Sequence, residues 1–254
     1  MTARARNRKP RSGRARGYDM KKLHKPDYHT SRPLFPLVRK HLDATPIRMI
    51  FDVGANIGQS AFEMHEEFPE ATIHSFEPVR ATYEMMKENI GDIASINLHN
   101  MALGKRAGSV EITNTPGALH NSVAEAGKTN VTVEMVESST GDLFCKQNQI
   151  GNIDYLKIDT EGLDMDVLLG FVGMFSAQAI GLVEVESSMN VRNRRHVPIE
   201  KMKSLLESLG YSVFHIYEMA SEAVFTGRPY MRRANFVFIS EAMVEANYKP
   251  RRRA

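Results

Sequence analysis

The chain has 254 residues, 42% hydrophobic and 25% charged, an ordinary composition for a soluble protein with one large core. It contains no apolar run long enough to span a bilayer and no signal-peptide pattern, so we expect neither membrane insertion nor secretion. A single cysteine, Cys145, excludes an intramolecular disulfide and a cysteine-rich metal site, and the cytoplasm is the expected compartment.

The net charge of +3 is unevenly distributed. Residues 1–25 hold ten Lys or Arg and one acid, residues 249–254 hold four basic residues, and the body between them is acidic. We predict a basic disordered tail over residues 1–25, a domain over residues 34–245 and a basic tail over residues 246–254. Nucleic acid, anionic lipid or organelle targeting would suit such tails, but a solubilising extension without a partner explains the same composition.

The first ligand-binding signal follows a predicted helix over residues 34–42 and a buried strand over residues 49–53. The strand leads into FDVGANIGQ, where Gly54 and Gly58 flank Asn56 and a helix is expected over residues 60–68. Glycines let the backbone turn sharply at the end of a parallel strand, and the following helix presents unpaired N–H groups. Asp52, Gly54, Asn56 and Gly58 are therefore candidate ligand-binding residues, although a helix cap and a tight turn need similar residues.

A second strand, residues 71–76, ends in FEP and places Glu77 at the tip of the neighbouring strand of a βαβ unit. Both hydroxyls of a ribose can donate to one carboxylate, so a nucleoside ligand is expected. An acid just before the glycine turn, Asp52, would repel a pyrophosphate but attract a sulfonium. S-adenosylmethionine is therefore favoured over a nicotinamide dinucleotide.

The next elements are a helix over residues 81–90 and a third strand over residues 95–103 that ends in MALG. Ala102 in that segment is expected near the base of the nucleoside. From residue 105 to 151 the pattern changes to period two, which predicts a small β insertion with a loop between its strands. His120 in that loop is a candidate catalytic base, although a lone loop histidine is also often simply exposed.

Two further strands, residues 154–159 and 179–186, end in acids at the same expected sheet edge. Asp159 and Glu161 are the leading candidates for catalysis, with Glu184 and Glu186 on the adjacent strand, and Asp159 is also a candidate cofactor contact. Asp159 with Glu161 or Asp164 would alternatively suit a divalent ion. Simpler roles are helix capping and loop orientation, and we assign no metal ligands from the sequence.

A helix over residues 199–209 and strands over residues 212–217 and 235–240 complete an α/β fold with seven sheet strands plus the inserted pair. Just before that helix, RNRRH at residues 192–196 would suit a phosphate or an acidic sugar, or a solvated loop.

The ordered series FDVGANIGQ, SFEP, MALG, LKIDTEGLDMDVLLG, LVEVE and NFVFIS resembles the FkbM-type S-adenosylmethionine-dependent methyltransferases over roughly residues 49–240. The resemblance implies a Rossmann-like class I methyltransferase fold, mostly parallel with an antiparallel last strand. It also implies methyl transfer to an oxygen, often a hydroxyl of a sugar or natural product. The chain departs from the family pattern at Gly141, which would loosen the return of the insertion, and at Asp164, a shorter acid without an assigned role.

We therefore predict an O-methyltransferase that uses S-adenosyl-L-methionine and acts on a small hydroxylated acceptor. An RNA methyltransferase that uses the basic tails, a binding protein that has lost catalysis, and a dehydrogenase are the alternatives.

Overall fold

The computed structural model describes residues 32–250 except 115–131, 191 and 194. Its main sheet has seven strands in the order β3-β2-β1-β7-β8-β10-β9. The first five run parallel, and β10 pairs antiparallel with both β8 and β9, as predicted. The strands are β1 (Met49–Val53), β2 (Thr72–Phe76), β3 (Ile96–His99), β7 (Ile153–Ile158), β8 (Ile180–Ser188), β9 (Tyr211–Ser221) and β10 (Met231–Ser240).

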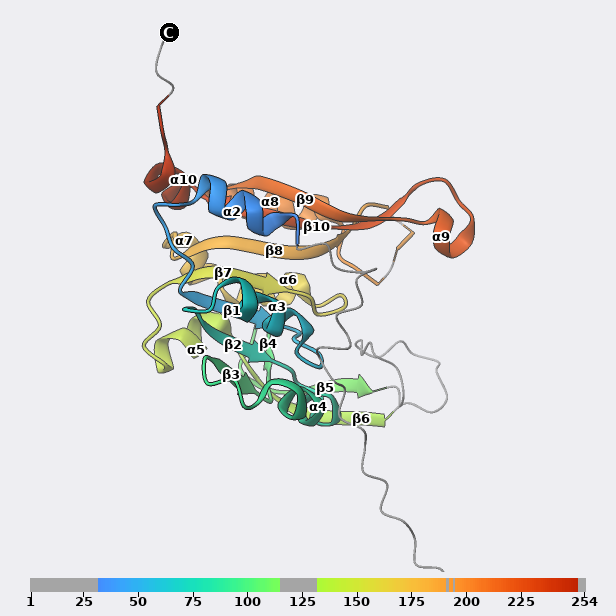
Figure 1. The fold of residues 1–254 in the computed structure, drawn as a ribbon. Coiled ribbons are helices and arrows are strands. Elements are labelled where there is room, and N and C mark those ends of the chain that lie inside the picture. The colour runs from blue at the N-terminus through green and yellow to red at the C-terminus, as the bar shows by residue number, and fades with distance from the viewer. Residues whose placement is uncertain (1–31, 115–131, 191, 194, 251–254) are drawn as a thin grey trace, which may run out of the picture.

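Helices cover both faces of this sheet (Figure 1). Alternate strand residues face opposite sides, so Ile50 and Phe51 of β1 belong to two different cores. The Ile50 core includes residues of α2 (Leu34–His41), α3 (Gln59–Glu67), α4 (Arg80–Ile90) and α10 (Glu241–Asn247). The Phe51 core includes residues of α5 (Gly141–Gln147), α6 (Asp164–Gly170), α7 (Val172–Ser176) and α8 (Ile199–Ser208).

The third predicted strand is divided between two sheets. After β3, the side chain of Asn100 donates to the carbonyls of Glu77 (3.0 Å) and Pro78 (2.9 Å), which fixes the turn that ends the strand. Ala102 and Leu103 then form β4 (Ala102–Leu103), in a second sheet of order β4-β6-β5. This sheet contains the predicted insertion, β5 (Gly108–Asn114) and β6 (Thr132–Ser139), so it has one strand more than expected among the described residues.

The departure from the family pattern at Gly141 does not loosen the insertion. A Cβ on Gly141 would lie 2.2 Å from the ring of Phe171, so glycine makes room for that buried side chain. The neighbouring Thr140 caps α5 through Leu143 N–H (3.1 Å), and Asp142 accepts hydrogen bonds from Gly173 N–H (2.8 Å) and from the residue after it. The return from the insertion is thus fixed to α7.

At the C-terminal end of the described chain, α10 runs through residue 247, two residues beyond the predicted end of the domain. Asn247 bonds the hydroxyl of Thr45 (2.8 Å), and Lys249 pairs with Asp43 (2.8 Å). The segment from 246 to 249 is thus tied to the body by the side chains of Asn247 and Lys249. The described residues include no helix with both the length and the apolar character needed to cross a bilayer. The tail predicted over residues 1–25 lies outside the described residues.

Between β9 and β10 lies a short helix that the sequence analysis did not predict, α9 (Ala223–Thr226). The hairpin that carries it extends past the carboxyl ends of the parallel strands (Figure 1).

Candidate active site

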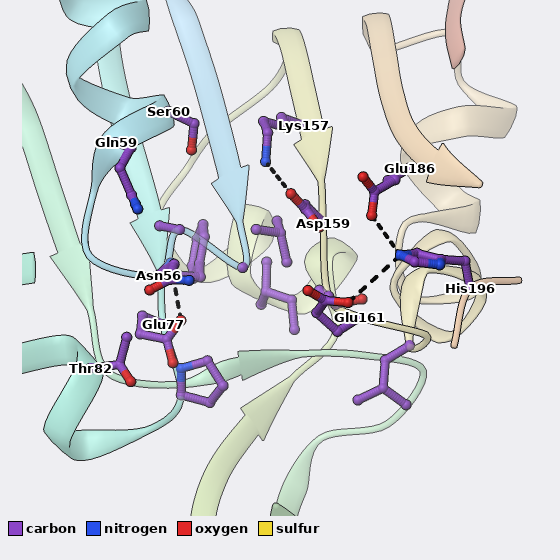
Figure 2. A pocket seen from close by; sticks show the side chains of 18 of the residues that line it. Asn56, Gln59, Ser60, Glu77, Thr82, Lys157, Asp159, Glu161, Glu186 and His196 are labelled. Atoms are coloured by element: carbon purple, nitrogen blue, oxygen red, sulfur yellow. Dashed lines mark hydrogen bonds and ion pairs between the residues drawn. The ribbon is translucent and has the colours of Figure 1, made fainter. Parts of the chain in front are cut away.

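A cavity of about 590 Å³ opens at the carboxyl ends of the parallel strands. Figure 2 shows Asn56 and Glu77 on one side of it and Glu161, Glu186 and His196 on the other. Along each of four strands and the residue that follows, two positions spaced by two lie on the same face of the sheet. These pairs are Asp52 and Gly54 at β1, Ser75 and Glu77 at β2, Lys157 and Asp159 at β7, and Glu184 and Glu186 in β8.

A buried row of polar residues crosses the sheet just below the cavity. Asp52 pairs in register with Ser75 on one side and Lys157 on the other, and Lys157 pairs with Glu184. Ser60 of α3 donates to Asp52 Oδ2 at 2.6 Å, and Lys157 Nζ lies 3.7 Å from Asp52 Oδ1. Asp52 is fully buried and is not among the described residues that line the cavity. Burial raises the pKa of Asp52, although Lys157 and Ser60 act to lower it.

Asp159, unlike Asp52, is among the residues that line the cavity. It follows β7, lines the cavity and accepts a hydrogen bond from Lys157 Nζ at 3.2 Å. Burial acts to raise the pKa of Asp159, but the charge and hydrogen bond of Lys157, together with Arg233 and His196, hold this pKa below its ordinary value. Burial likewise acts to lower the pKa of Lys157, but Asp159 and Asp52 keep it above the ordinary value. Lys157 is thus a buried cation held between two carboxylates.

The glycine turn is shaped by its neighbours in the fold. Gly54 has φ +84° and lines the cavity, and a Cβ there would lie 2.0 Å from the carbonyl oxygen of Asp159. Gly58 has φ +94°, and a Cβ there would lie 2.6 Å from Ile90 of α4. Gly58 is not among the described residues that line the cavity, whereas Asn56 is. Gly54 is therefore needed for the approach of β7, and Gly58 for the packing of α4.

Glu77 closes the opposite side of the turn. Its Oε2 accepts a hydrogen bond from Asn56 N–H (3.1 Å), and its Oε1 accepts one from Val79 N–H (3.0 Å). The side chain is 7% exposed and lines the cavity. Burial raises the pKa of Glu77 to about 7, against the two backbone hydrogen bonds, which act to lower it. Each oxygen retains a lone pair for a donor in the cavity.

An apolar wall lies beside Glu77. Met101, Ala102 and Leu103 line the cavity there, together with Val79 and Ile112. Ala102 therefore lies at the cavity, and its predicted position near the base of a nucleoside stays a prediction.

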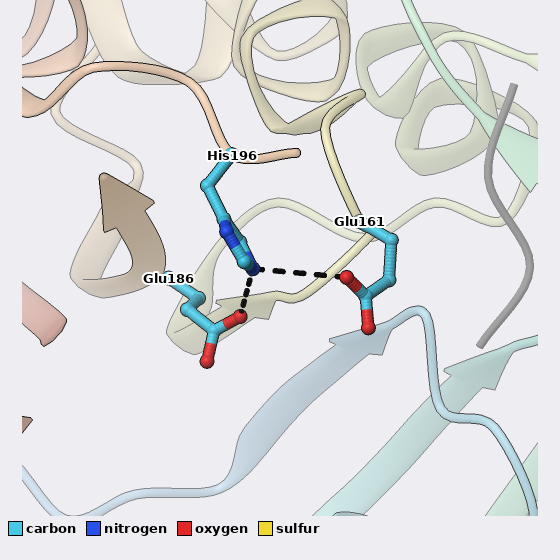
Figure 3. Close-up of side chains that lie close together, drawn as sticks. All are labelled: Glu161, Glu186 and His196. Atoms are coloured by element: carbon cyan, nitrogen blue, oxygen red, sulfur yellow. Dashed lines mark ion pairs between the residues drawn. The ribbon is translucent and has the colours of Figure 1, made fainter. Parts of the chain in front are cut away.

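Glu161, Glu186 and His196 meet at the other end of the cavity (Figure 3). His196 Nε2 lies 2.6 Å from Glu186 Oε2 and 3.7 Å from Glu161 Oε2. Arg195 Nε lies 2.5 Å from Glu161 Oε2, and Arg233 pairs with Glu186 Oε1. Burial lowers the pKa of His196, although Glu161 acts to raise it. The cluster thus combines two carboxylates, two guanidinium groups and one buried imidazole.

Asp164 holds the loop that carries Glu161. The structure buries this acid to 1% exposure, and it accepts hydrogen bonds from Thr160 N–H (3.4 Å) and Gly162 N–H (3.1 Å). Burial raises its pKa to about 6. Asp164 is not among the described residues that line the cavity. The acid at this departure from the family pattern therefore has a structural role, which is to hold the loop that carries Glu161.

Glu184 is not among the described residues that line the cavity. Glu184 is buried at 2% exposure, accepts from Arg32 at 3.2 Å and also bonds the hydroxyl of Tyr155, so it is held inside the fold. His120 lies outside the described residues.

The position of His196 beside Glu161 and Glu186 was not predicted from the sequence. The one sequence feature that pointed to this residue was the basic run at residues 192–196. Residue spacing does not reveal that the loop after β8 returns to the sheet edge and brings His196 against Glu186. Lys157 was also missed, although its position two residues before Asp159 places both side chains on one face.

The strand order and the single antiparallel strand within it define a Rossmann-like methyltransferase fold. The family model described as the methyltransferase FkbM domain matches residues 52–213, which is more than half of the chain. The chain belongs to the FkbM methyltransferase family.

Individual relatives are more distant. Methyltransferase 1 of Beauveria bassiana is 28% identical over 142 residues, 48% of this chain and 57% of that protein. The hexuronic acid methyltransferase AglP of Haloferax volcanii is 24% identical over 148 residues, 57% of this chain and 59% of that protein. The chain thus spans less than three fifths of either relative. A solved structure of methyltransferase FkbM from Methylobacillus flagellatus KT has 14% identity and a TM-score of 0.49, covering 75% of this chain and 44% of that one.

Proposed function

We propose that this protein is an S-adenosylmethionine-dependent O-methyltransferase that acts on a hydroxyl of a small molecule. Family membership supports methyl transfer, and the observation that carries the choice of cofactor is the position of Glu77. Its carboxylate is fixed by two backbone N–H groups and faces a cavity at the carboxyl edge of the sheet. A buried acid in that place suits a ribose diol.

The residues around Glu77 fit the rest of this cofactor. Gly54 keeps the turn open where a Cβ would collide with the neighbouring strand, and Ala102 belongs to an apolar wall suited to a nucleobase. Asp159 offers an anion and Asn56 a polar contact in the same cavity. When bound, S-adenosylmethionine supplies an electrophilic methyl group, so that the acceptor oxygen gains a methyl group and loses a proton. Asp52 would act indirectly, by fixing Lys157 beneath Asp159.

The proton of the acceptor hydroxyl needs a base within hydrogen-bond reach. Glu161 is our first candidate and Asp159 our second, because both line the cavity beyond the end of β7. A base at this position also aligns the acceptor oxygen with the methyl group, and such alignment supplies much of the acceleration in a displacement reaction.

The acceptor class is proposed from the cavity and the relatives together. Arg195, Arg232 and Arg233 line the cavity, and each pairs with an acid, so the lining is charged and hydrogen-bonding. The name of AglP states a hexuronic acid substrate. We therefore propose a small sugar or natural-product acceptor rather than nucleic acid.

Two measurements test this function. Titration calorimetry of the full chain should detect binding of S-adenosylmethionine and S-adenosylhomocysteine but not of NAD. Incubation with isotopically labelled S-adenosylmethionine and separate small-molecule and RNA fractions should then label a small molecule in base-resistant ether linkage. Binding of NAD alone, or label confined to RNA, would overturn the proposal. Tight cofactor binding without labelled product in any fraction would favour a protein that has lost catalysis.

A further inference from the structure

We infer that Glu161, Glu186 and His196 form a binding site for a divalent transition-metal ion on the wall of the cavity. Each residue presents one ligand atom, and the three atoms lie within 4.8 Å of one another. Figure 3 shows both carboxylates turned toward the same edge of the imidazole. They come from separate parts of the chain: the loop after β7, strand β8, and the segment before α8.

The spacing suits a single ion. Two ligands at right angles around an ion, each about 2.1 Å from it, lie about 3 Å apart. The Nε2 of His196 is 2.6 Å from Glu186 Oε2 and 3.7 Å from Glu161 Oε2, so the observed distances lie on either side of that value. The third pair, the two carboxylate oxygens, lies within 4.8 Å, so small side-chain movements would bring all three atoms around one ion. One nitrogen and two carboxylate oxygens favour Mn²⁺ or Zn²⁺ over Ca²⁺ or Mg²⁺, which prefer oxygen ligands alone.

The ligands are held in place by neighbouring groups. His196 Nδ1 lies 3.0 Å from Nδ2 and 3.4 Å from Oδ1 of Asn193, whose amide also bonds the backbone. The backbone fixes the orientation of this amide, because Oδ1 accepts from Arg195 N–H (3.0 Å) and Nδ2 donates to the carbonyl of Arg232 (3.4 Å). In the imidazole tautomer with its proton on Nδ1, this N–H donates to Oδ1 and leaves the Nε2 lone pair toward the carboxylates. Gly162 has φ +111° and packs on the backbone of Arg195, where a Cβ would lie 2.6 Å from its carbonyl oxygen.

The two arginines affect the site differently. Arg233 binds Oε1 of Glu186, while His196 faces Oε2, so this ion pair is compatible with a bound cation. Arg195 binds Oε2 of Glu161, the same oxygen that faces His196, so it competes with a cation. Loss of Arg195 should therefore strengthen metal binding. If these residues form only an ion-pair network without a metal site, the loss of Arg195 should produce no gain in metal binding.

The function of the ion rests on the proposed O-methyltransferase activity. A cation on this wall would coordinate the acceptor hydroxyl and lower its pKa, and the released proton would pass to water. Glu161 would then be a ligand rather than the base. The binding site itself is independent of that chemistry and can be tested without an acceptor.

The experiment uses the full chain without a histidine tag, treated with chelator and titrated with Mn²⁺ while the signal of free Mn²⁺ is followed by electron paramagnetic resonance. We expect one Mn²⁺ per chain, displaced by Zn²⁺. Glu186→Gln and Glu161→Gln should each weaken binding by about tenfold to a hundredfold or more. The control Glu88→Gln, an exposed acid on α4, should leave it unchanged. Arg195→Gln should tighten it severalfold.

Several outcomes would overturn the inference. These are absence of Mn²⁺ and Zn²⁺ binding at millimolar concentration, equal binding by the parent and both glutamate variants, or unchanged binding in Arg195→Gln. Circular dichroism verifies that each variant is folded, and the two glutamate side chains are similarly buried, at 17% exposure for Glu161 and 12% for Glu186. Binding of S-adenosylmethionine, measured separately by calorimetry, keeps a failure of the metal site distinct from a failure of the proposed function.

Discussion

The backbone N–H of Asn56 donates to the carboxylate of Glu77, 21 residues later in the chain, at 3.1 Å. This contact joins the turn after β1 to the tip of β2, so the two features that suggest a nucleoside ligand are one structural unit. It also orients the carboxylate, because Val79 N–H holds the other oxygen at 3.0 Å. A carboxylate fixed in advance loses little conformational entropy when a ligand binds.

Glu77→Ala should weaken binding of S-adenosylhomocysteine about tenfold to a hundredfold. Hydrogen bonds to a charged group contribute about 1.5 to 3 kcal/mol, and the variant removes the only side-chain acceptor proposed for the ribose. Calorimetry gives the dissociation constant, with Glu66→Ala, an exposed acid on α3, as the control. Equal affinities in the parent and Glu77→Ala would rule out this residue as the ribose contact.

Cofactor affinity should rise with pH through neutrality. The pKa of Glu77 is about 7 because of burial, and only the ionised form accepts from both ribose hydroxyls. Binding therefore releases a proton below pH 7, and affinity should fall at most about tenfold for each pH unit below that value. Calorimetry at pH 6 and 8 tests this, and Glu77→Gln should remove the pH dependence. A flat profile in the parent would contradict the assignment.

The same raised pKa has a separate consequence for the ligand-free protein. A carboxyl group whose pKa is higher in the folded than in the unfolded state contributes stability that is fully present below the unfolded value. This contribution is lost as the pH rises through about 7. Glu77→Gln should therefore reduce the loss of thermal stability of the free protein between pH 5 and pH 8.

Gly54→Ala should be more damaging than an ordinary glycine substitution. Its Cβ would lie 2.0 Å from a backbone oxygen at φ +84°, so we expect a loss of about 3 kcal/mol or more and impaired cofactor binding. Gly227→Ala is the matched control, because φ there is +74° and no atom lies within 4 Å of the added Cβ. That change should cost about 1 to 2 kcal/mol. If urea unfolding gives the same loss of unfolding free energy for Gly54→Ala and Gly227→Ala, the close approach of Gly54 to the residue after β7 is unimportant.

Lys157→Met should destabilise the fold by about 3 to 5 kcal/mol, because it leaves the buried Asp52 without its cation. Adding Asp52→Asn should recover part of this loss, since the second change removes the unpaired charge. Lys203→Met on α8 breaks an exposed pair with Glu207 and should cost about 0.5 kcal/mol or less. The free energy of unfolding of the double variant is compared with the sum of the losses in the two single variants. A loss in the double variant larger than that sum would argue against a charge pair.

Much of the fold follows from local sequence patterns. Apolar runs that end in an acid or glycine correctly indicated the parallel strands, and period-two spacing indicated the inserted sheet. The third strand was predicted as one continuous strand. The apolar pattern does not reveal that the side chain of Asn100 bonds the carbonyl of Glu77, after β2, and ends the strand there. Helices α7, α9 and α10 are short, so their periodicity carries little signal.

The site was predictable to the extent that it lies on strands. Glu77, Asp159 and Glu161 line the cavity because parallel strands end at one edge, whereas Asp52, two residues before Gly54, is not among the described residues that line it. Their roles in binding and catalysis stay predictions. His196 comes from a loop, and its contact with Glu186 depends on the return of the chain. Tertiary placement of loops is the part of the site that local pattern does not determine.

The most direct test of the account is a crystal structure with bound S-adenosylhomocysteine. We predict that both ribose hydroxyls lie within hydrogen-bond distance of the Glu77 carboxylate, with the base against Ala102 and the turn at Gly54 beside the ligand. A ribose bound elsewhere, or a diphosphate lying across the glycine turn, would contradict it.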